Sequence, residues 1–413
     1  MKDINKQVLI SCVLGSTISL YDFLIFGVAT ALVFGKLFFP EHGFLIPLLV
    51  FAVGFIVRPI GAMVYGHLGD KFGRKGILVS TLLLTGMSTV AIGLLPTYES
   101  IGIWAPILLI LFRIVQTFAS GGEWAAASVM MLEQNSKSDK RGFIGSLVSS
   151  GLAWALLLSG IAWGWASSYG QEFLVTWGWR IPFLFSSVLL VLGVYTRLKV
   201  LETPEYLQIK DKALKSPLWV SFKDHWKMMI PAIGMQQMSG SLVYGITVFG
   251  ISYLATAHQI NRADLNLQWL MLMPVVLASI LFFGWLGDKI SRVNVYLIGS
   301  IASIALSYPI FYWLGAGNFI LPAALGVAIT AMMFWAQSSS FLVEIFPTEV
   351  RQSGGGVIFG VGGLVGGGIV PLIAQNLMSN YGIMAVAHLF LIMSIIALLS
   401  TLWLRRYKSL SNG

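Results

Sequence analysis

The sequence predicts an all-α polytopic membrane protein, with twelve transmembrane helices in two pseudo-symmetric six-helix bundles. Three observations lead to this fold class. Of the 413 residues, 57% are hydrophobic and only 10% are charged, whereas soluble domains carry about 25% charged residues. The chain holds twelve apolar stretches long enough to cross a bilayer, which takes about 20 residues each. Short patterns in the first half also recur, in weaker form, in the second half.

The twelve apolar stretches are separated by short polar connections, which set their expected boundaries. They cover residues 8–38, 44–66, 76–96, 102–133, 141–168, 178–198, 226–257, 265–287, 293–315, 318–346, 352–378 and 380–404. The longest hydrophilic stretch lies between the sixth and seventh spans. We therefore expect an N-terminal bundle over residues 1–198, a cytoplasmic linker over 199–225 and a C-terminal bundle over 226–413.

Lysine and arginine residues gather on alternate loops and at both ends of the chain, as in Lys2, residues 71–75 and Arg405. Loops rich in these residues stay in the cytoplasm. We therefore expect a multi-pass protein of a bacterial-type cytoplasmic (inner) membrane, with both termini in the cytoplasm. The net charge of +9 follows from this topology, so no nucleic-acid partner is expected. The expected partners are the bilayer and a small molecule, and the expected state is a monomer.

A short charged motif ends the second span and recurs at the end of the eighth. The copies are residues 66–75 (Gly-His-Leu-Gly-Asp-Lys-Phe-Gly-Arg-Lys) and 284–292 (Gly-Trp-Leu-Gly-Asp-Lys-Ile-Ser-Arg). In both, the aspartate precedes an arginine by four residues. The glycines, Gly66 among them, predict a tight turn and a close approach between helices. Two copies about 220 residues apart indicate two homologous halves.

Further motifs carry a resemblance to a known family. They are Tyr21-Asp22-Phe23, Arg58-Pro59-Ile60-Gly61-Ala62, Arg113-Ile114-Val115-Gln116, Gly121-Gly122-Glu123-Trp124, Trp179-Arg180-Ile181-Pro182-Phe183, Glu202-Thr203-Pro204 and Phe346-Pro347-Thr348-Glu349-Val350-Arg351. With the 66–75 motif, they resemble the metabolite:proton symporter branch of the major facilitator superfamily, which includes proline/betaine, α-ketoglutarate, citrate and shikimate transporters. The resemblance implies secondary active transport by alternating access between two bundles.

The sequence departs from the pattern of this branch at two places. Ser19 and Leu20 stand where a Glu-Trp pair usually precedes the Tyr-Asp-Phe motif, and Thr117 stands where a glycine usually follows Gln116. The missing carboxylate at position 19 calls into question the usual coupling chemistry or the usual substrate.

Four charged residues lie well inside the expected spans, namely Asp22, Arg58, Arg113 and Glu123. A charge at the centre of a membrane helix costs about 2.5–3.5 kcal/mol on insertion scales, so each one needs a reason. Because arginine stays protonated, the proton of a coupled transporter is expected on Asp22 or Glu123, with the arginines as switching partners. The alternative is a static ion pair that only orients helices.

The arginines also predict the substrate, because a guanidinium group binds a carboxylate through two parallel hydrogen bonds. We expect Arg58 and Arg113 to contact a carboxylate-bearing substrate, with Tyr21 and Gln116 beside them. The C-terminal half offers only polar and aromatic residues for the opposite wall: Gln236, Gln237, Tyr244, Trp335 and Gln337. Each of these has the alternative role of a polar residue in helix packing.

The charged motifs are candidate gates. Asp70 is expected to face the positive N-terminal end of the eleventh span. One expected cluster joins Asp70, Arg74, Glu133 and Arg141, and its repeat joins Asp288, Arg292, Glu344 and Arg351. The family resemblance implies that such contacts lock the halves together in the outward-open state. The alternative is a set of loop charges that fixes topology alone. The glycine-rich eleventh span predicts either close packing against the second span or a hinge.

The leading hypothesis is proton-coupled symport of a small carboxylate or zwitterion, such as an organic acid, amino acid or betaine. The alternatives are a proton antiporter that exports a drug or siderophore, and a nutrient sensor with a transporter fold. An enzyme is not expected: the chain has no Walker A pattern, and its five histidines and single Cys12 form no metal-ligand or nucleophile–base set. No cofactor or metal is expected, only the proton as coupling ion.

Overall fold

The structure is a computed structural model that describes residues 5–40 and 45–411. In this part of the chain, twelve helical stretches are long and apolar enough to cross a membrane, as expected. They run over Lys6–Phe38, Leu49–Phe72, Arg74–Leu94, Trp104–Glu133, Arg141–Ser168, Arg180–Leu198, Pro217–Ala257, Asp264–Ile290, Arg292–Gly315, Pro322–Glu344, Thr348–Tyr381 and Ile383–Tyr407. Lys2, which contributed to the predicted topology, lies outside the described residues.

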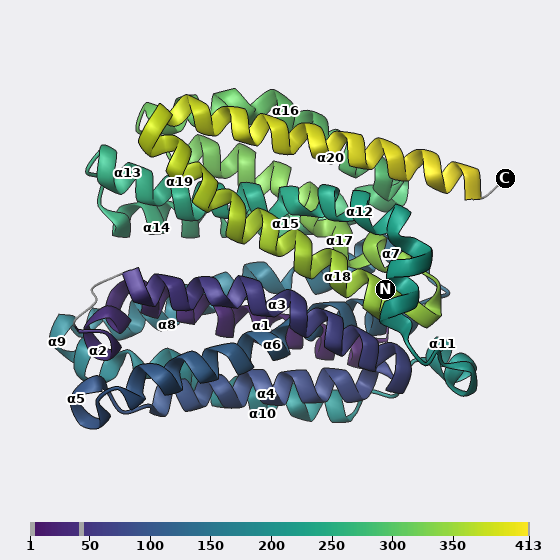
Figure 1. Ribbon diagram of the computed structural model, residues 1–413, viewed down its shortest axis with the longest axis horizontal. Helices are drawn as coiled ribbons and strands as arrows, with labels where there is room; N and C mark the ends of the chain where they lie inside the picture. Colours follow the sequence, from purple (N-terminus) through teal and green to yellow (C-terminus); the bar gives the residue numbers. More distant parts are fainter. Residues whose placement is uncertain (1–4, 41–44, 412–413) are drawn as a thin grey trace.

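Most helices of the first half of the sequence lie in the lower layer of Figure 1, and most helices of the second half lie in the upper layer. The first half contains α1 (Lys6–Ala29), η1 (Thr30–Phe34), α2 (Gly35–Phe38), α3 (Leu45–Phe72), α4 (Arg74–Leu94), α5 (Tyr98–Ile101), α6 (Trp104–Glu133), α7 (Arg141–Ser149), α8 (Gly151–Ser168), α9 (Gln171–Phe173), η2 (Leu174–Gly178) and α10 (Arg180–Leu198).

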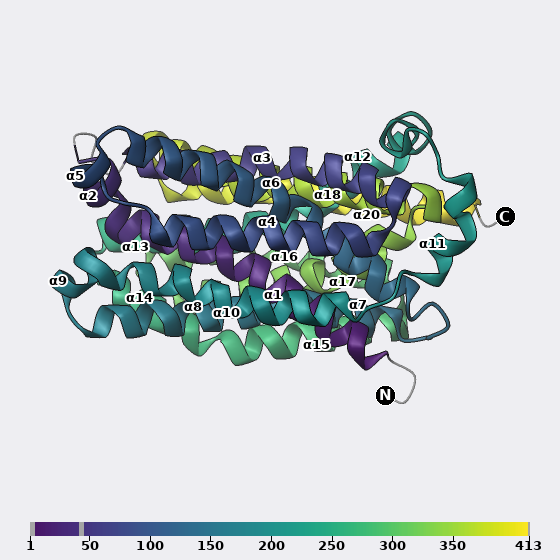
Figure 2. The same ribbon diagram turned by 90° about the horizontal axis from the view of Figure 1, so that it is seen from below.

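The linker and the second half contain α11 (Pro204–Ile209), η3 (Lys210–Lys212), α12 (Pro217–Tyr244), η4 (Gly245–Gly250), α13 (Ile251–Ala257), α14 (Arg262–Met271), α15 (Met273–Ile290), α16 (Arg292–Gly315), η5 (Pro322–Ala331), α17 (Met332–Glu344), η6 (Thr348–Val350), α18 (Arg351–Gly363), η7 (Leu364–Ile369), α19 (Val370–Tyr381) and α20 (Ile383–Ser411). Both ends of the chain and α11 lie at the same end of the molecule (Figures 1 and 2). We call this the basic end, made of residues 66–75, 133–143, 197–217, 284–292 and 344–353.

The 66–75 motif is mostly helical, which corrects the prediction of a turn. Helix α3 continues through Gly66 and Asp70 to Phe72. Only Gly73, with φ of +106°, interrupts the helix before α4 begins. A positive φ is a conformation that glycine adopts without strain. Gly66 serves a close approach instead, because a Cβ atom there would lie 2.8 Å from the Cα atom of Ser353 on α18.

The irregular part of the linker is shorter than residues 199–225, because α12 begins at Pro217. Proline is favoured at the first position of a helix, where its missing N–H group has no partner to lose. Within the linker, the Thr203 hydroxyl caps α11 by accepting the backbone N–H of Tyr206 at 3.2 Å. The linker is thus an ordered part of the basic end.

The halves meet along two sets of helices. Helix α3 packs against α18, and α7 packs against α15 and α17. On α18, a Cβ atom at Gly356 would lie 3.1 Å from the Ala62 carbonyl oxygen, and one at Gly360 would lie 2.9 Å from the Cα atom of Pro59. The glycines of the eleventh span therefore pack closely against the second span, one of the two roles that the sequence left open.

Candidate functional site

Two arginine side chains lie together between the halves, well inside the apolar spans. The guanidinium groups of Arg58 on α3 and Arg113 on α6 lie over the ring of Phe23, at 5.5 and 4.7 Å from its centroid. Arg58 also lies 5.7 Å from the centroid of Phe359 on α18. Both arginines lie near Tyr244 on α12. We call Arg58 and Arg113 the arginine site, and it draws its surroundings from both halves.

Neither arginine forms an ion pair with a carboxylate of the described chain. Arg113 is fully buried, and its Nη1 atom donates to Gln116 Oε1 at 2.8 Å. Its Nε and Nη2 atoms, like Nε of Arg58, have no hydrogen-bond partner. A buried polar group without a partner costs about 1–3 kcal/mol, and more when it is charged. The arginine site therefore offers free donors to an anionic group.

Asp22, on α1, is fully buried but is not paired with an arginine. Its Oδ1 atom accepts a hydrogen bond from the Ser186 hydroxyl at 2.6 Å, while its Oδ2 atom has no hydrogen-bond donor. The side chain of Thr89, on α4, lies close enough to interact with the carboxyl group. For Asp22, the structure therefore shows neither an arginine partner nor the alternative of a static ion pair.

Glu123 has a partner that the sequence analysis missed. It forms a buried ion pair with Arg197 of α10 and accepts a hydrogen bond from the Thr81 hydroxyl at 2.9 Å. Arg197 lies at the end of the sixth span, where a basic residue is expected to be a loop charge rather than a partner inside the bundle. This pair lies inside the N-terminal bundle, where Gly15 leaves room for the guanidinium group.

Three predicted binding residues point into their own bundles, away from the arginine site. The hydroxyl of Tyr21 donates to a carbonyl oxygen of α10 at 2.7 Å. Gln237 donates to a carbonyl oxygen of α20 at 3.1 Å, and Gln337 donates to one of α15. These hydrogen bonds match the alternative role in helix packing that the sequence analysis left open, and their place in the binding site stays a prediction. The rotation of each helix, which sequence spacing does not fix, decides this outcome.

Gln236 and Trp335, which were predicted to line the binding site, both lie at helix contacts. Gln236 packs against Gly362 of α18, and its Oε1 atom has no partner. The indole N–H of Trp335 donates to the Ser149 carbonyl oxygen of α7 at 2.8 Å, and the Ser149 hydroxyl donates back to the Trp335 carbonyl oxygen at 3.1 Å. Trp335 therefore connects the halves directly.

Trp124 and Phe359 are central residues that the prediction did not include. Their rings stack face to face across the two halves, with centroids 3.8 Å apart and planes at 4°. The Trp335 ring lies 5.7 Å from that of Phe359. The only signal in the sequence was the position of Trp124 in the Gly-Gly-Glu-Trp motif. These rings cover the face of the arginine site that is nearer to the C-terminal half.

The first charged motif forms a cluster at the basic end. The Asp70 carboxylate accepts the backbone N–H groups of Gln352 and Ser353, at 3.1 and 2.8 Å, from the N-terminus of α18. A helix N-terminus attracts negative charge. Further ion pairs join Asp70 to Arg74 at 3.4 Å, Arg74 to Glu133 at 3.3 Å and Glu133 to Arg351 at 3.0 Å. We call these four charged residues the N cluster.

The second motif repeats this arrangement in the other half. The Asp288 carboxylate accepts the backbone N–H groups of Gly142 and Phe143, at 2.7 and 2.8 Å, from the N-terminus of α7. Ion pairs join Arg292 to Asp288 at 3.3 Å and to Glu344, and Glu344 to Arg141 at 2.9 Å. We call Asp288, Arg292, Glu344 and Arg141 the C cluster.

The clusters exchange one arginine relative to the prediction. Arg141 was expected with Asp70 and Arg351 with Asp288, but each lies in the other cluster. The reason is that each aspartate binds the first turn of a helix from the opposite half, and the arginine that begins that helix comes with it. Each cluster therefore ties the two halves together.

Comparison with known proteins places this geometry in a family. Residues 8–218 match the family model described as sugar (and other) transporter. The chain is 33% identical to the shikimate transporter of Escherichia coli (strain K12), over 89% of this chain and 86% of that protein. The chain belongs to the sugar (and other) transporter family. It is therefore a multi-pass membrane transporter and not an enzyme.

Other relatives of this transporter have similar coverage. It is 33% identical to an inner membrane metabolite transport protein of Escherichia coli (strain K12), over 92% of this chain and 90% of that one. It is 32% identical to the proline/betaine transporter of Salmonella typhimurium, over 96% and 82%. The structure of the proton:xylose symporter XylE, 16% identical, aligns over 97% of this chain and 95% of its own, with a TM-score of 0.74. The major facilitator fold is thus confirmed.

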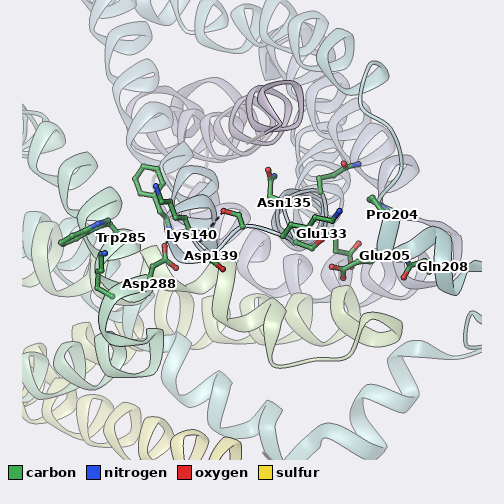
Figure 3. A pocket seen from close by; sticks show the side chains of 15 residues that line it. Glu133, Asn135, Asp139, Lys140, Pro204, Glu205, Gln208, Trp285 and Asp288 are labelled. Atoms are coloured by element: carbon green, nitrogen blue, oxygen red, sulfur yellow. Dashed lines mark hydrogen bonds between the residues drawn. The ribbon is translucent and has the colours of Figure 1, made fainter. Parts of the chain in front are cut away.

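A pocket at the basic end of the transporter lies between Glu133 of the N cluster and Asp288 of the C cluster. Its volume is about 1280 Å³. Figure 3 shows Glu205 and Gln208 of the linker on one side, and Trp285 and Asp288 on the other. The lining residues are Glu133, Gln134, Asn135, Ser136, Lys137, Ser138, Asp139, Lys140, Phe143, Pro204, Glu205, Gln208, Trp285, Asp288 and Lys289. The pocket therefore touches both clusters, at Glu133 and at Asp288.

Proposed function

We propose that this transporter carries a small carboxylate-bearing metabolite together with a proton, by alternating access. The arginine site is the observation that supports this: two guanidinium groups share the ring of Phe23 and have donors without a carboxylate partner. A planar guanidinium group recognises a carboxylate through two hydrogen bonds. The relatives named for shikimate and for proline and betaine support a substrate of this kind, since all of these molecules carry a carboxylate.

We propose Asp22 as the proton site. The fully buried carboxyl group lacks a donor at Oδ2, and a proton bound there supplies one. Glu123 is less suited to this role, because its pair with Arg197 already satisfies its charge. A substrate anion that moves with one proton crosses without net charge, so the pH difference across the membrane drives it.

We also propose an orientation for the transporter. The lysine and arginine bias supports an orientation in which the basic end, with both termini, lies on the cytoplasmic side of a bacterial inner membrane. Both clusters join the halves at that end, so this structure is closed toward the cytoplasm. We further propose that the transporter works as a monomer, without nucleic acid and without a cofactor other than the proton.

The test is uptake into proteoliposomes with an imposed pH gradient. The panel is labelled shikimate, proline, glycine betaine and α-ketoglutarate. We expect one of these to accumulate only when the outside is acidic. Arg113→Lys and Arg58→Lys each lose a forked donor set and should weaken its binding about tenfold, or about 1.4 kcal/mol. Arg406→Lys, on the exposed end of α20, is the matched control.

Three outcomes contradict the proposal. Undiminished uptake by both Arg113→Lys and Arg58→Lys removes the arginine site from substrate binding. Concentrative uptake that survives Asp22→Asn removes Asp22 from proton coupling. Accumulation driven by a sodium gradient at equal pH on both sides would replace the proton as coupling ion.

A further inference from the structure

A continuous row of buried side chains joins the arginine site to Asp22. Nη1 of Arg113 donates to Oε1 of Gln116 at 2.8 Å. Nε2 of Gln116 donates to the Thr89 hydroxyl at 2.8 Å and, at 3.4 Å, to the Asp22 carbonyl oxygen. The Thr89 side chain in turn lies near the Asp22 carboxyl group, although its hydroxyl donates to the Thr85 carbonyl oxygen. The row crosses three helices, α6, α4 and α1, and all four side chains are buried.

The chemistry of these groups fixes the direction of each hydrogen bond. Arginine has donors only, so Gln116 must present its carbonyl oxygen to Arg113 and its amide to Thr89. The Thr89 oxygen accepts that bond and keeps one proton to give. In this structure the proton goes to the Thr85 carbonyl oxygen, at 2.9 Å. The Asp22 carboxyl group is the second acceptor beside Thr89, and its Oδ2 atom has no donor.

We propose that Gln116 and Thr89 are positioning residues that couple the arginine site to the protonation of Asp22, an inference that rests on the proposed function. When Asp22 is ionised, Thr89 turns its O–H group to the carboxylate, and the bond from Gln116 strengthens that donation. When Asp22 carries a proton on Oδ2, it donates to the Thr89 oxygen, and Thr89 donates to Thr85. In the observed geometry Thr89 donates to the Thr85 carbonyl oxygen, as in this second arrangement, while Oδ2 of Asp22 has no hydrogen-bond partner.

Substrate enters this sequence by competition. A substrate carboxylate binds the free Nε and Nη2 donors of Arg113 and, by drawing the guanidinium group toward itself, weakens the Nη1 bond to Gln116 Oε1. Gln116 is then free to turn, and Thr89 loses the bond that strengthens its donation to ionised Asp22. Asp22 takes up a proton more readily as a result. Because coupling between two sites is reciprocal, proton binding also favours substrate binding, which is the requirement for symport.

The other charged groups near Asp22 already have partners. From α10, Arg197 pairs with Glu123, and Arg180 donates to two carbonyl oxygens at the end of α4, at 2.7 Å each. The hydroxyl of the neighbouring Tyr21 donates to α10. Helix α8 contains no charged residue, and α4 and α7 carry charge only at the basic end. The arginine site is thus the charged group that remains to communicate with Asp22.

Infrared titration of the purified, substrate-free transporter tests the row. The carboxyl band of Asp22 is identified by its loss in Asp22→Asn. We expect Thr89→Val and Gln116→Leu each to raise the pH of half-titration of this band by about 0.5–1 unit, since each removes about one hydrogen bond from the ionised state. The double variant should shift no further than Thr89→Val alone, because Gln116 acts through Thr89.

Two variants serve as controls. Thr85→Val makes the same change one turn earlier on α4, where the hydroxyl has no partner, and should leave the band unshifted. Thr89→Ser keeps the O–H group and should behave as the wild type.

Four results overturn the inference: no shift in Gln116→Leu, additive shifts in the double variant, an equal shift in Thr85→Val, or no titrating Asp22 band between about pH 4 and pH 10. These readings need no substrate. Failure of the wild type to accumulate any carboxylate therefore overturns the proposed function separately.

Discussion

The N cluster and the C cluster have the same design but differ in their access to water. Each places an aspartate on the N-terminus of a helix from the opposite half. The side chains of Asp70, Arg74 and Glu133 are 0% exposed. In the C cluster, Asp288 is 9% exposed, Arg292 20% and Glu344 12%. Charges attract more strongly where water is excluded. The contact between the aspartate and the helix N-terminus should therefore be stronger in the N cluster than in the C cluster.

The linker is the cause of this difference. The Thr203 hydroxyl donates to Glu133 at 2.6 Å, Glu205 pairs with Arg351, and the Tyr206 ring lies 5.0 Å from the Arg74 guanidinium group. In the described part of the chain, no linker residue forms a hydrogen bond to the C cluster, and the pocket in Figure 3 is lined by Asp288 of that cluster as well as by Glu133 of the N cluster. We infer that the N cluster contributes more to keeping the basic end closed.

The comparison can be measured with one cysteine reporter. Ser340 of α17 is fully buried against Gly145 of α7, so its position becomes accessible only when the basic end opens. Ser340→Cys in a Cys12→Ala background provides a single thiol. Its alkylation rate by a water-soluble reagent reports the open fraction, which follows the free-energy difference between the two states.

The largest effect is expected from Asp70→Asn. The change leaves Arg74 short of a buried partner and removes the charge that binds α18, and breaking a buried ion pair costs about 3–5 kcal/mol. Alkylation of the reporter should therefore rise on the order of 100-fold, with substrate affinity little changed. An unchanged alkylation rate, or an unchanged maximal uptake rate, would count against the N cluster as a gate.

Asp288→Asn should have a smaller effect. Its cluster is partly hydrated, so we expect about 1 kcal/mol, or about a fivefold rise in alkylation, that shrinks further at high salt. The same reporter and the same reagent give the comparison. If this variant opened the basic end as much as Asp70→Asn, the two clusters would contribute equally. The inference that the linker strengthens the N cluster would then be wrong.

The smallest effect is expected from Glu205→Gln, which removes the linker's ion pair with Arg351. The Glu205 side chain is 24% exposed, so the loss should be below about 1 kcal/mol. Alkylation should rise about twofold at low salt and by less at high salt. Glu172→Gln, exposed at the opposite end, is the control. A rise as large as that of Asp70→Asn would make the linker itself the principal lock.

The fold was predictable because hydrophobicity alone marks the spans. What the sequence did not indicate was the end of α3, because a polar motif at a membrane surface continues a helix as readily as it forms a turn. The exchange of Arg141 and Arg351 was also hidden, since it depends on which helix end meets which carboxylate across the interface. Residue spacing within one half carries no information on that contact.

The candidate site was predictable only in part. Buried charge singled out Asp22, Arg58 and Arg113, because its cost in lipid demands a reason. The same argument did not reveal the partner of Glu123, which lies near the end of another span. Rotation about the helix axis decides whether a side chain such as Gln337 points to the interface or into its own bundle, and packing sets that rotation.

The contact between α3 and α18 affects how easily the halves can move. Gly356 and Gly360 bring backbone against backbone there, so sliding one helix along the other requires few torsions to leave their preferred values. Reordering long side chains costs up to about 2 kcal/mol for each residue in rotamer entropy, and this surface avoids that cost. A single added methyl group at Gly360 should therefore act as an obstruction, because a Cβ atom there would lie 2.9 Å from the Cα atom of Pro59.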